Sequence, residues 1–136
     1  MKNNVNIIAV LDENREKLLV CKRRKEPYKG LLNLVGGKLK PGEDGYAAAY
    51  RELEEETGIT GDDITLTHLM DLVYYLEDTK LEVYFGCLNK KLEVHGDENE
   101  LLWIDRQQNY FDESRFAGEG NIGHIMERIR KSEHEM

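Results

Sequence analysis

Residues 37–59 read GKLKPGEDGYAAAYRELEEETGI, and this stretch decides how the rest of the chain is interpreted. Pro41-Gly42 predicts a turn, and Asp44 has the short acidic side chain that favours a helix N-cap. We therefore expect a helix over 45–57. Gly58 should end it, because glycine most readily adopts the left-handed backbone conformation found after a helix.

Three carboxylates of this predicted helix, Glu52, Glu55 and Glu56, fall on one face, because residues three and four positions apart are neighbours on a helix. Like charges at this spacing repel one another. A divalent cation would convert the repulsion into coordination, and clustered carboxylate oxygens suit Mg²⁺ or Mn²⁺. The alternative is an acidic face that is simply solvated. Gly45 and Ala48, one or two turns earlier on this face, should leave room for a bulky ligand.

The spacing of these residues resembles the Nudix box, Gly-x5-Glu-x7-Arg-Glu-U-x-Glu-Glu-x-Gly-U, in which U is a large aliphatic residue. The chain matches every fixed position, namely Gly37, Glu43, Arg51, Glu52, Leu53, Glu55, Glu56, Gly58 and Ile59. The resemblance implies an α/β fold, a Nudix-type α/β/α sandwich with a mixed β-sheet between helices, as a single domain over 1–136. It also implies a pyrophosphohydrolase that uses Mg²⁺ or Mn²⁺ to hydrolyse a nucleoside diphosphate linked to a further group X.

The same resemblance implies roles for individual residues. The three helix glutamates match the family's metal ligands. Glu52 also matches the residue proposed as general base in some members, while others place the base in a later loop. Gly37 matches the glycine whose backbone lies close to the metal and phosphate. Glu43 and Arg51 match the residues that brace the loop and orient the carboxylates.

A further acidic metal ligand often lies in a loop before a late tryptophan in this family. Residues 95–103 read HGDENELLW and look like that region. Glu98 and Glu100 are both candidates, and the sequence does not choose between them. The alternative for either residue is a place in a solvated acidic loop.

Three residues near the box are candidates for substrate contact. Arg23 begins the basic run 23–25 at a strand end that faces substrate in the family. Asn33 and Lys38 belong to an Asn-x-x-Gly-Gly-Lys string, which resembles members that clear oxidised purine nucleotides such as 8-oxo-dGTP. The alternatives stay open: the basic side chains could be solvated, and Asn33 could hydrogen-bond a strand backbone.

The favoured function is therefore hydrolysis of a nucleoside triphosphate to a monophosphate and pyrophosphate. Oxidised purine nucleotides are among the possible substrates. One alternative is a Nudix hydrolase of another diphosphate, such as a sugar nucleotide or ADP-ribose. The other is a nucleotide-binding module without catalysis, although such proteins usually lose box glutamates and this chain retains all of them.

Composition narrows the class of protein further. A chain of 136 residues that is 40% hydrophobic can form one core. Its net charge of −8 argues against a surface for duplex nucleic acid. No apolar run is long enough to cross a membrane, and the N-terminus lacks a signal-peptide pattern, so we expect a cytoplasmic protein with reduced Cys21 and Cys87. The sequence leaves a monomer and a homodimer equally open.

Hydrophobic periodicity predicts the remaining elements. Apolar and β-branched runs predict strands over 5–11, 18–22, 33–37, 64–76, 81–88 and 101–104, of which the first two should form a hairpin. Apolar residues at helical spacing predict a second helix over 122–131. This order of strands, helix, strands and helix predicts a mixed sheet covered by helices.

Overall fold

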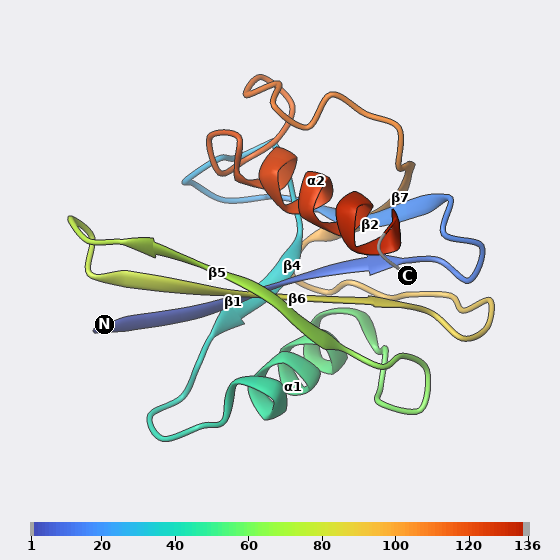
Figure 1. The fold of residues 1–136 in the computed structure, drawn as a ribbon, viewed down its shortest axis with the longest axis horizontal. Coiled ribbons are helices and arrows are strands. Elements are labelled where there is room, and N and C mark those ends of the chain that lie inside the picture. The colour runs from blue at the N-terminus through green and yellow to red at the C-terminus, as the bar shows by residue number, and fades with distance from the viewer. Residues whose placement is uncertain (1, 135–136) are drawn as a thin grey trace.

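The computed structural model describes residues 2–134. The single domain expected over 1–136 therefore includes three residues outside the described part. All strands belong to one mixed sheet, and the two helices cover its opposite faces (Figure 1). This arrangement is the expected α/β/α sandwich. The elements are β1 (Asn3–Leu11), β2 (Lys17–Lys22), β3 (Leu32–Asn33), β4 (Val35–Lys38), α1 (Gly45–Thr57), β5 (Thr67–Tyr74), β6 (Thr79–Cys87), β7 (Glu100–Asp105) and α2 (Asn121–His134).

Strand β1 is the centre of the sheet. It runs parallel to β6 along its whole length. Its other edge is divided, because β4 pairs antiparallel with Val5–Ile8 and β2 pairs only where Leu11 meets Leu18. The predicted hairpin of β1 and β2 is therefore confirmed, but it is short, and β2 forms most of its ladder with β7. This division gives β4 a place beside the N-terminal half of β1.

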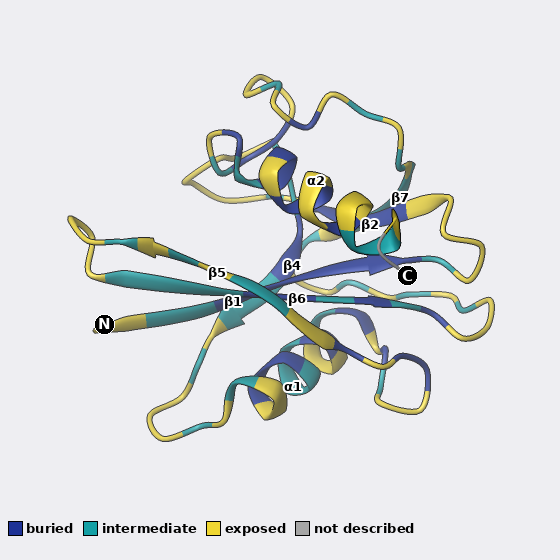
Figure 2. Ribbon diagram, viewed as in Figure 1, coloured by how far each residue is buried: buried dark blue, intermediate teal, exposed yellow. Residues whose placement is uncertain are grey.

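Alternation along β1 supplies the core on both sides of the sheet. Ile7 and Ala9 pack in a cluster with Ile125 of α2, whereas Ile8 packs in a second cluster with Leu53 of α1. Figure 2 shows the buried centre of the sheet between helices whose outer surfaces are exposed. A strand segment buried on both faces must be almost wholly apolar, which explains why residues 7–11 of β1 are all apolar.

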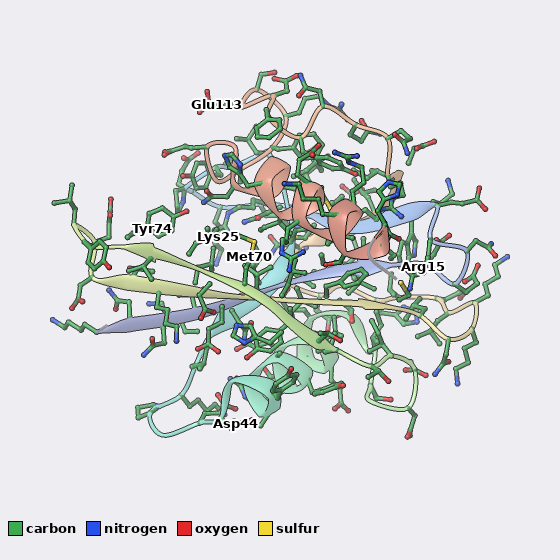
Figure 3. All side chains as sticks on the ribbon, viewed as in Figure 1. Arg15, Lys25, Asp44, Met70, Tyr74 and Glu113 are labelled. Carbon is green, nitrogen blue, oxygen red and sulfur yellow. The ribbon has the colours of Figure 1, made fainter. Side chains whose placement is uncertain are left out.

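Helix α1 begins and ends at the residues that the sequence predicts. The Asp44 side chain, labelled at the start of the helix in Figure 3, accepts a hydrogen bond of 3.2 Å from the Ala47 N–H. Gly58 has φ of 82°, and its N–H donates to the Glu54 carbonyl at 2.9 Å. These local contacts satisfy polar groups that a helix leaves unpaired at each end.

The expectation that Gly45 and Ala48 leave room for a ligand is wrong. Ala48 is fully buried. A Cβ atom on Gly45 would lie 2.3 Å from the Tyr84 hydroxyl and 2.4 Å from a Glu82 carboxylate oxygen. The small residues instead let α1 approach the sheet closely, which fixes the distance between the helix and the strands beneath it.

Two predicted strands differ from the structure. The strand expected over 33–37 is divided into β3 and β4 on either side of Leu34. The strand expected over 64–76 is shorter, because Ile64 makes only an isolated bridge to Leu88 and residues 75–78 form the turn into β6. Leu76 is fully exposed in that turn. The apolar residues at both ends of this segment made the predicted strand longer than the hydrogen-bonded strand that forms.

Two further expectations can be compared with the structure. Cys21 and Cys87 are both free thiols, so the expected reduced state matches the structure. Neither helix of the described residues combines the length and the apolar character required to cross a membrane.

Replacing Ile125 by alanine should destabilise the fold, because this fully buried side chain joins α2 to the sheet. Removing a buried isoleucine side chain in this way costs about 2–5 kcal/mol. Urea denaturation followed by circular dichroism measures the free energy of unfolding. Lys131→Ala, on the exposed face of the same helix, is the matched control and should change it little. Equal effects of the two substitutions would contradict this account of the core.

Candidate active site

Arg51 connects three of the box glutamates. Its guanidinium forms a fork with Glu43, with Nε donating at 2.7 Å and Nη2 at 2.9 Å. Its Nη1 donates to Glu52 at 3.0 Å and to Glu55 at 3.1 Å. The bond to Arg51 is the main reason that the pKa of Glu43 is lowered to about 2. One side chain therefore orients acidic groups from the loop and from the helix.

The glycines of β4 permit a close approach on both sides of that strand. A Cβ atom on Gly37 would lie 2.5 Å from the carboxyl carbon of Glu52. A Cβ atom on Gly36 would lie 2.2 Å from the Asn6 carbonyl oxygen of β1. Glycine at these positions therefore lets the Glu52 carboxylate lie against β4 while β4 remains paired with the central strand.

Four glutamates face one cavity of about 420 Å³, which we call the acidic cavity. Of the two candidates outside the helix, Glu98 lines it and Glu100 does not. Glu100 instead begins β7, where it pairs with Lys22 and is exposed. Among the described residues, no lysine or arginine lines this cavity. The lining residues are Glu52, Glu55, Glu56, Asp97, Glu98, Asn99 and Leu101.

Glu56 lies half-buried beside the other carboxylates of the acidic cavity. Burial raises its pKa, as do the charges of Glu52, Glu98 and Glu55, and the result is about 7. A hydrogen bond from the Gly36 backbone opposes this shift. In the absence of a cation, the cavity therefore favours the protonated form of a carboxyl group that is normally ionised at neutral pH.

The donor set of the acidic cavity fits a hard divalent cation, because carboxylate oxygens are the ligands such ions prefer. No three acidic, histidine or cysteine side chains of residues 2–134 already converge in an arrangement that could hold a metal ion. Glu52 and Glu55 are hydrogen-bonded to Arg51 instead. Their carboxylates would have to turn toward the cavity to bind a cation.

The predicted substrate-contact residues have distinct surroundings. Arg23 Nε donates to the Pro27 carbonyl at 2.7 Å, and Arg23 lines a second cavity of about 270 Å³. Asn33 lines the same cavity, and its Oδ1 accepts a hydrogen bond of 2.8 Å from the Leu34 N–H, which is the backbone role left open by the sequence. Lys38 ends β4 with an exposed side chain.

Sequence reasoning missed two asparagines that line this second cavity, Asn6 and Asn99. A signal existed for Asn6, which is a polar residue within the apolar run of β1. No local signal could have revealed Asn99, because its Oδ1 accepts from the Arg24 N–H, 75 residues away in the sequence. Arg24 Nη1 also donates to the Asp97 carbonyl at 3.1 Å, so Arg24 holds the loop before β7.

Glu56→Gln should stabilise the cation-free protein at alkaline pH. The raised pKa means that Glu56 stabilises the fold when protonated, and that this contribution disappears as pH rises from about 4.5 through about 7. Allowing for partial exposure of the side chain, the variant should gain about 2 kcal/mol relative to wild type between pH 5 and pH 8. Chemical denaturation in EDTA at each pH measures this difference.

The matched control is Glu54→Gln, which removes a carboxylate from an exposed position of the same helix. Its stability profile should follow that of the wild type. If the Glu56→Gln profile also ran parallel to the wild type across this pH interval, the description of the cavity's electrostatics would be wrong.

Comparison with known proteins places this geometry in a family. Residues 2–122 match the model of the NUDIX domain. The methanol dehydrogenase activator of Bacillus methanolicus is 32% identical over 118 residues, which cover 82% of this chain and 63% of the relative. An ADP-ribose pyrophosphatase of Bacillus subtilis is 39% identical over 62 residues, covering 45% of this chain and 32% of the relative. The chain spans less than two thirds of the length of these curated relatives.

Solved structures show the same fold at low sequence identity. The binary complex of a Caenorhabditis elegans Ap4A hydrolase has a TM-score of 0.77 at 19% identity and covers 97% of this chain and 99% of that one. The NUDIX domain of Shewanella oneidensis NrtR, complexed with ADP ribose, has a TM-score of 0.72 at 14% identity. The match covers 95% of this chain and 86% of that one. The domain match extends over most of the sequence and includes the whole box, so the chain belongs to the Nudix family.

Proposed function

We propose that this protein is a hydrolase that uses a divalent cation to cleave a nucleoside diphosphate linked to a further group X. The observation that carries the proposal is that Glu52, Glu55, Glu56 and Glu98 all line one acidic cavity. Mg²⁺ is the proposed cation, and Mn²⁺ should replace it, because both prefer oxygen ligands.

In this proposal Glu52, Glu55 and Glu56 hold the cation, with Glu98 as a further ligand from the loop before β7. A bound cation of this kind neutralises phosphate oxygens and lowers the pKa of a water molecule. Arg51 orients the helix carboxylates, and Glu43 holds the guanidinium in place. Water adds to one phosphorus of the substrate, and the bond from that phosphorus to the bridging oxygen breaks. Positioning and charge stabilisation supply most of the catalysis.

The second cavity supports a site for the nucleoside. It shares Glu56 and Asn99 with the acidic cavity, so one ligand could extend from one into the other. Our leading substrate is a nucleoside triphosphate, including oxidised purine nucleotides, cleaved to a monophosphate and pyrophosphate. Arg23, Asn33 and Lys38 are the proposed substrate contacts, and the position of Arg23 and Asn33 on this cavity supports their assignment.

A second candidate substrate is ADP-ribose. It is favoured by the relatives described as ADP-ribose pyrophosphatases, from Bacillus subtilis and from Methanocaldococcus jannaschii. The matched segments cover 45% and 35% of this chain. The acidic cavity suits either substrate, since both contain a diphosphate.

A panel of nucleotides should separate the two candidates. With Mg²⁺, the wild-type protein should convert nucleoside triphosphates, among them 8-oxo-dGTP, to monophosphate and pyrophosphate faster than it cleaves ADP-ribose. Product identification by ion-exchange chromatography distinguishes pyrophosphate from ribose 5-phosphate. Faster cleavage of ADP-ribose would establish the second candidate, and no cleavage of any compound with either cation would contradict the proposed activity.

Glu55→Gln should reduce turnover with Mg²⁺ by roughly 100-fold or more, because it removes a proposed cation ligand. The side chain is more than half exposed, so the fold should remain intact. Initial rates measured against Mg²⁺ concentration test this expectation, with thermal unfolding as a check on structure. Glu54→Gln is the matched control on the same helix and should retain wild-type rates. A wild-type rate in Glu55→Gln would show that the metal assignment is wrong.

A further inference from the structure

The turn over 96–99 carries Glu98, which lines the acidic cavity, and leads into β7. The turn is tight, because a Cβ atom on Gly96 would lie 2.4 Å from the Asn99 carbonyl oxygen. Residues 91–99 form no helix or strand, so the ladders of the sheet do not fix this turn. The position of the Glu98 carboxylate therefore depends on the individual contacts that the turn makes with the rest of the molecule.

Arg24 supplies two of those contacts, one from its backbone and one from its side chain. The Arg24 N–H donates to Asn99 Oδ1 at 3.2 Å, and Arg24 Nη1 donates to the Asp97 carbonyl at 3.1 Å. The two bonds reach the residues on either side of Glu98. Arg24 therefore holds the backbone from which the Glu98 carboxylate projects, although it does not itself line the acidic cavity.

The register of the sheet explains why Arg24 meets this turn. Strands β2 and β7 are antiparallel, and their ladder ends where Lys22 pairs with Glu100. Continuing that register by two residues places Arg24 opposite Glu98. The pairing that holds β7 beside β2 thus also brings the arginine to the turn.

We propose that Arg24 is a positioning residue for the cation site, and that it acts by holding Glu98 toward the acidic cavity. In the proposed site Arg51 has the corresponding role for Glu52 and Glu55, to which it donates directly. Groups that orient metal ligands contribute to metal affinity although they do not touch the ion. The inference rests on the proposed function, because it assumes that Glu98 binds the cation.

Binding of Mn²⁺ in the absence of nucleotide tests this role separately from any contact between Arg24 and substrate. Electron paramagnetic resonance of the free ion measures the dissociation constant. Arg24→Ala should weaken binding about 10-fold, the lower end of the effect of groups that orient metal ligands. Arg24→Lys should regain part of this loss, since lysine retains a side-chain donor. Lys25→Ala removes the same charge from the neighbouring exposed residue and should bind Mn²⁺ as the wild type does.

A double-mutant cycle with Glu98→Gln identifies the group through which Arg24 acts. Glu98→Gln alone should also weaken Mn²⁺ binding. In that background Arg24→Ala should lower the affinity by less than about 2-fold more, because no carboxylate is left for the arginine to position. Additive losses, a wild-type affinity in Arg24→Ala, or a wild-type protein that binds no Mn²⁺ would overturn the inference.

Thermal unfolding of each variant without cation checks that a loss of affinity does not come from an unfolded domain. Arg24 is exposed, so the melting temperature of Arg24→Ala should stay close to that of the wild type. If this variant does not fold, Arg24→Met keeps the length of the side chain without its donors and takes its place in the cycle. Weaker Mn²⁺ binding by Arg24→Ala, in a protein that cleaves no nucleotide, would refute only the proposed activity.

Discussion

The charge balance around Arg51 is the interaction on which the site depends. Carboxylates on one helix face repel one another, and the guanidinium offsets part of that repulsion through Glu52 and Glu55. Glu43 anchors the guanidinium from the other side with two hydrogen bonds. Glu56 receives no such bond from Arg51, and its pKa is raised by burial and by the charges of the neighbouring carboxylates. The protein thus stabilises most of the acidic row through Arg51 and leaves Glu56 without a cationic partner among the described hydrogen bonds.

Close backbone packing determines where this row lies. Gly36 lets β4 pair tightly with β1, and Gly37 leaves the space that the Glu52 carboxylate occupies. The Gly37 N–H also donates to Asn6 Oδ1, and the Nδ2 of the same amide has no hydrogen-bond partner among the described residues. Two adjacent glycines therefore connect the geometry of the acidic cavity with that of the second cavity. A larger residue at either position would disturb both.

The sequence predicts features that depend on neighbours along the chain. The limits of α1 follow from Asp44 and Gly58, whose caps form within four residues. Features that depend on distant contacts were missed or misjudged. The sequence predicts open space beside Ala48, but Ala48 is buried, because the strands that cover it are distant in the sequence. The positions of Glu98 and Glu100 relative to the helix likewise follow from how β7 pairs with β2, which periodicity does not define.

In the proposed function, the two cavities have different tasks in substrate recognition. The acidic side chains would bind a cation and, through it, any diphosphate, so the box residues would carry little information about X. The second cavity is lined by other residues, among them Asn6, Asn33 and Asn99, and in the proposed function it would hold the nucleoside. Substrate choice should therefore reside in side chains outside the box. Because the two cavities meet at Glu56 and Asn99, a nucleoside held in the second cavity would bring its phosphates toward the acidic row.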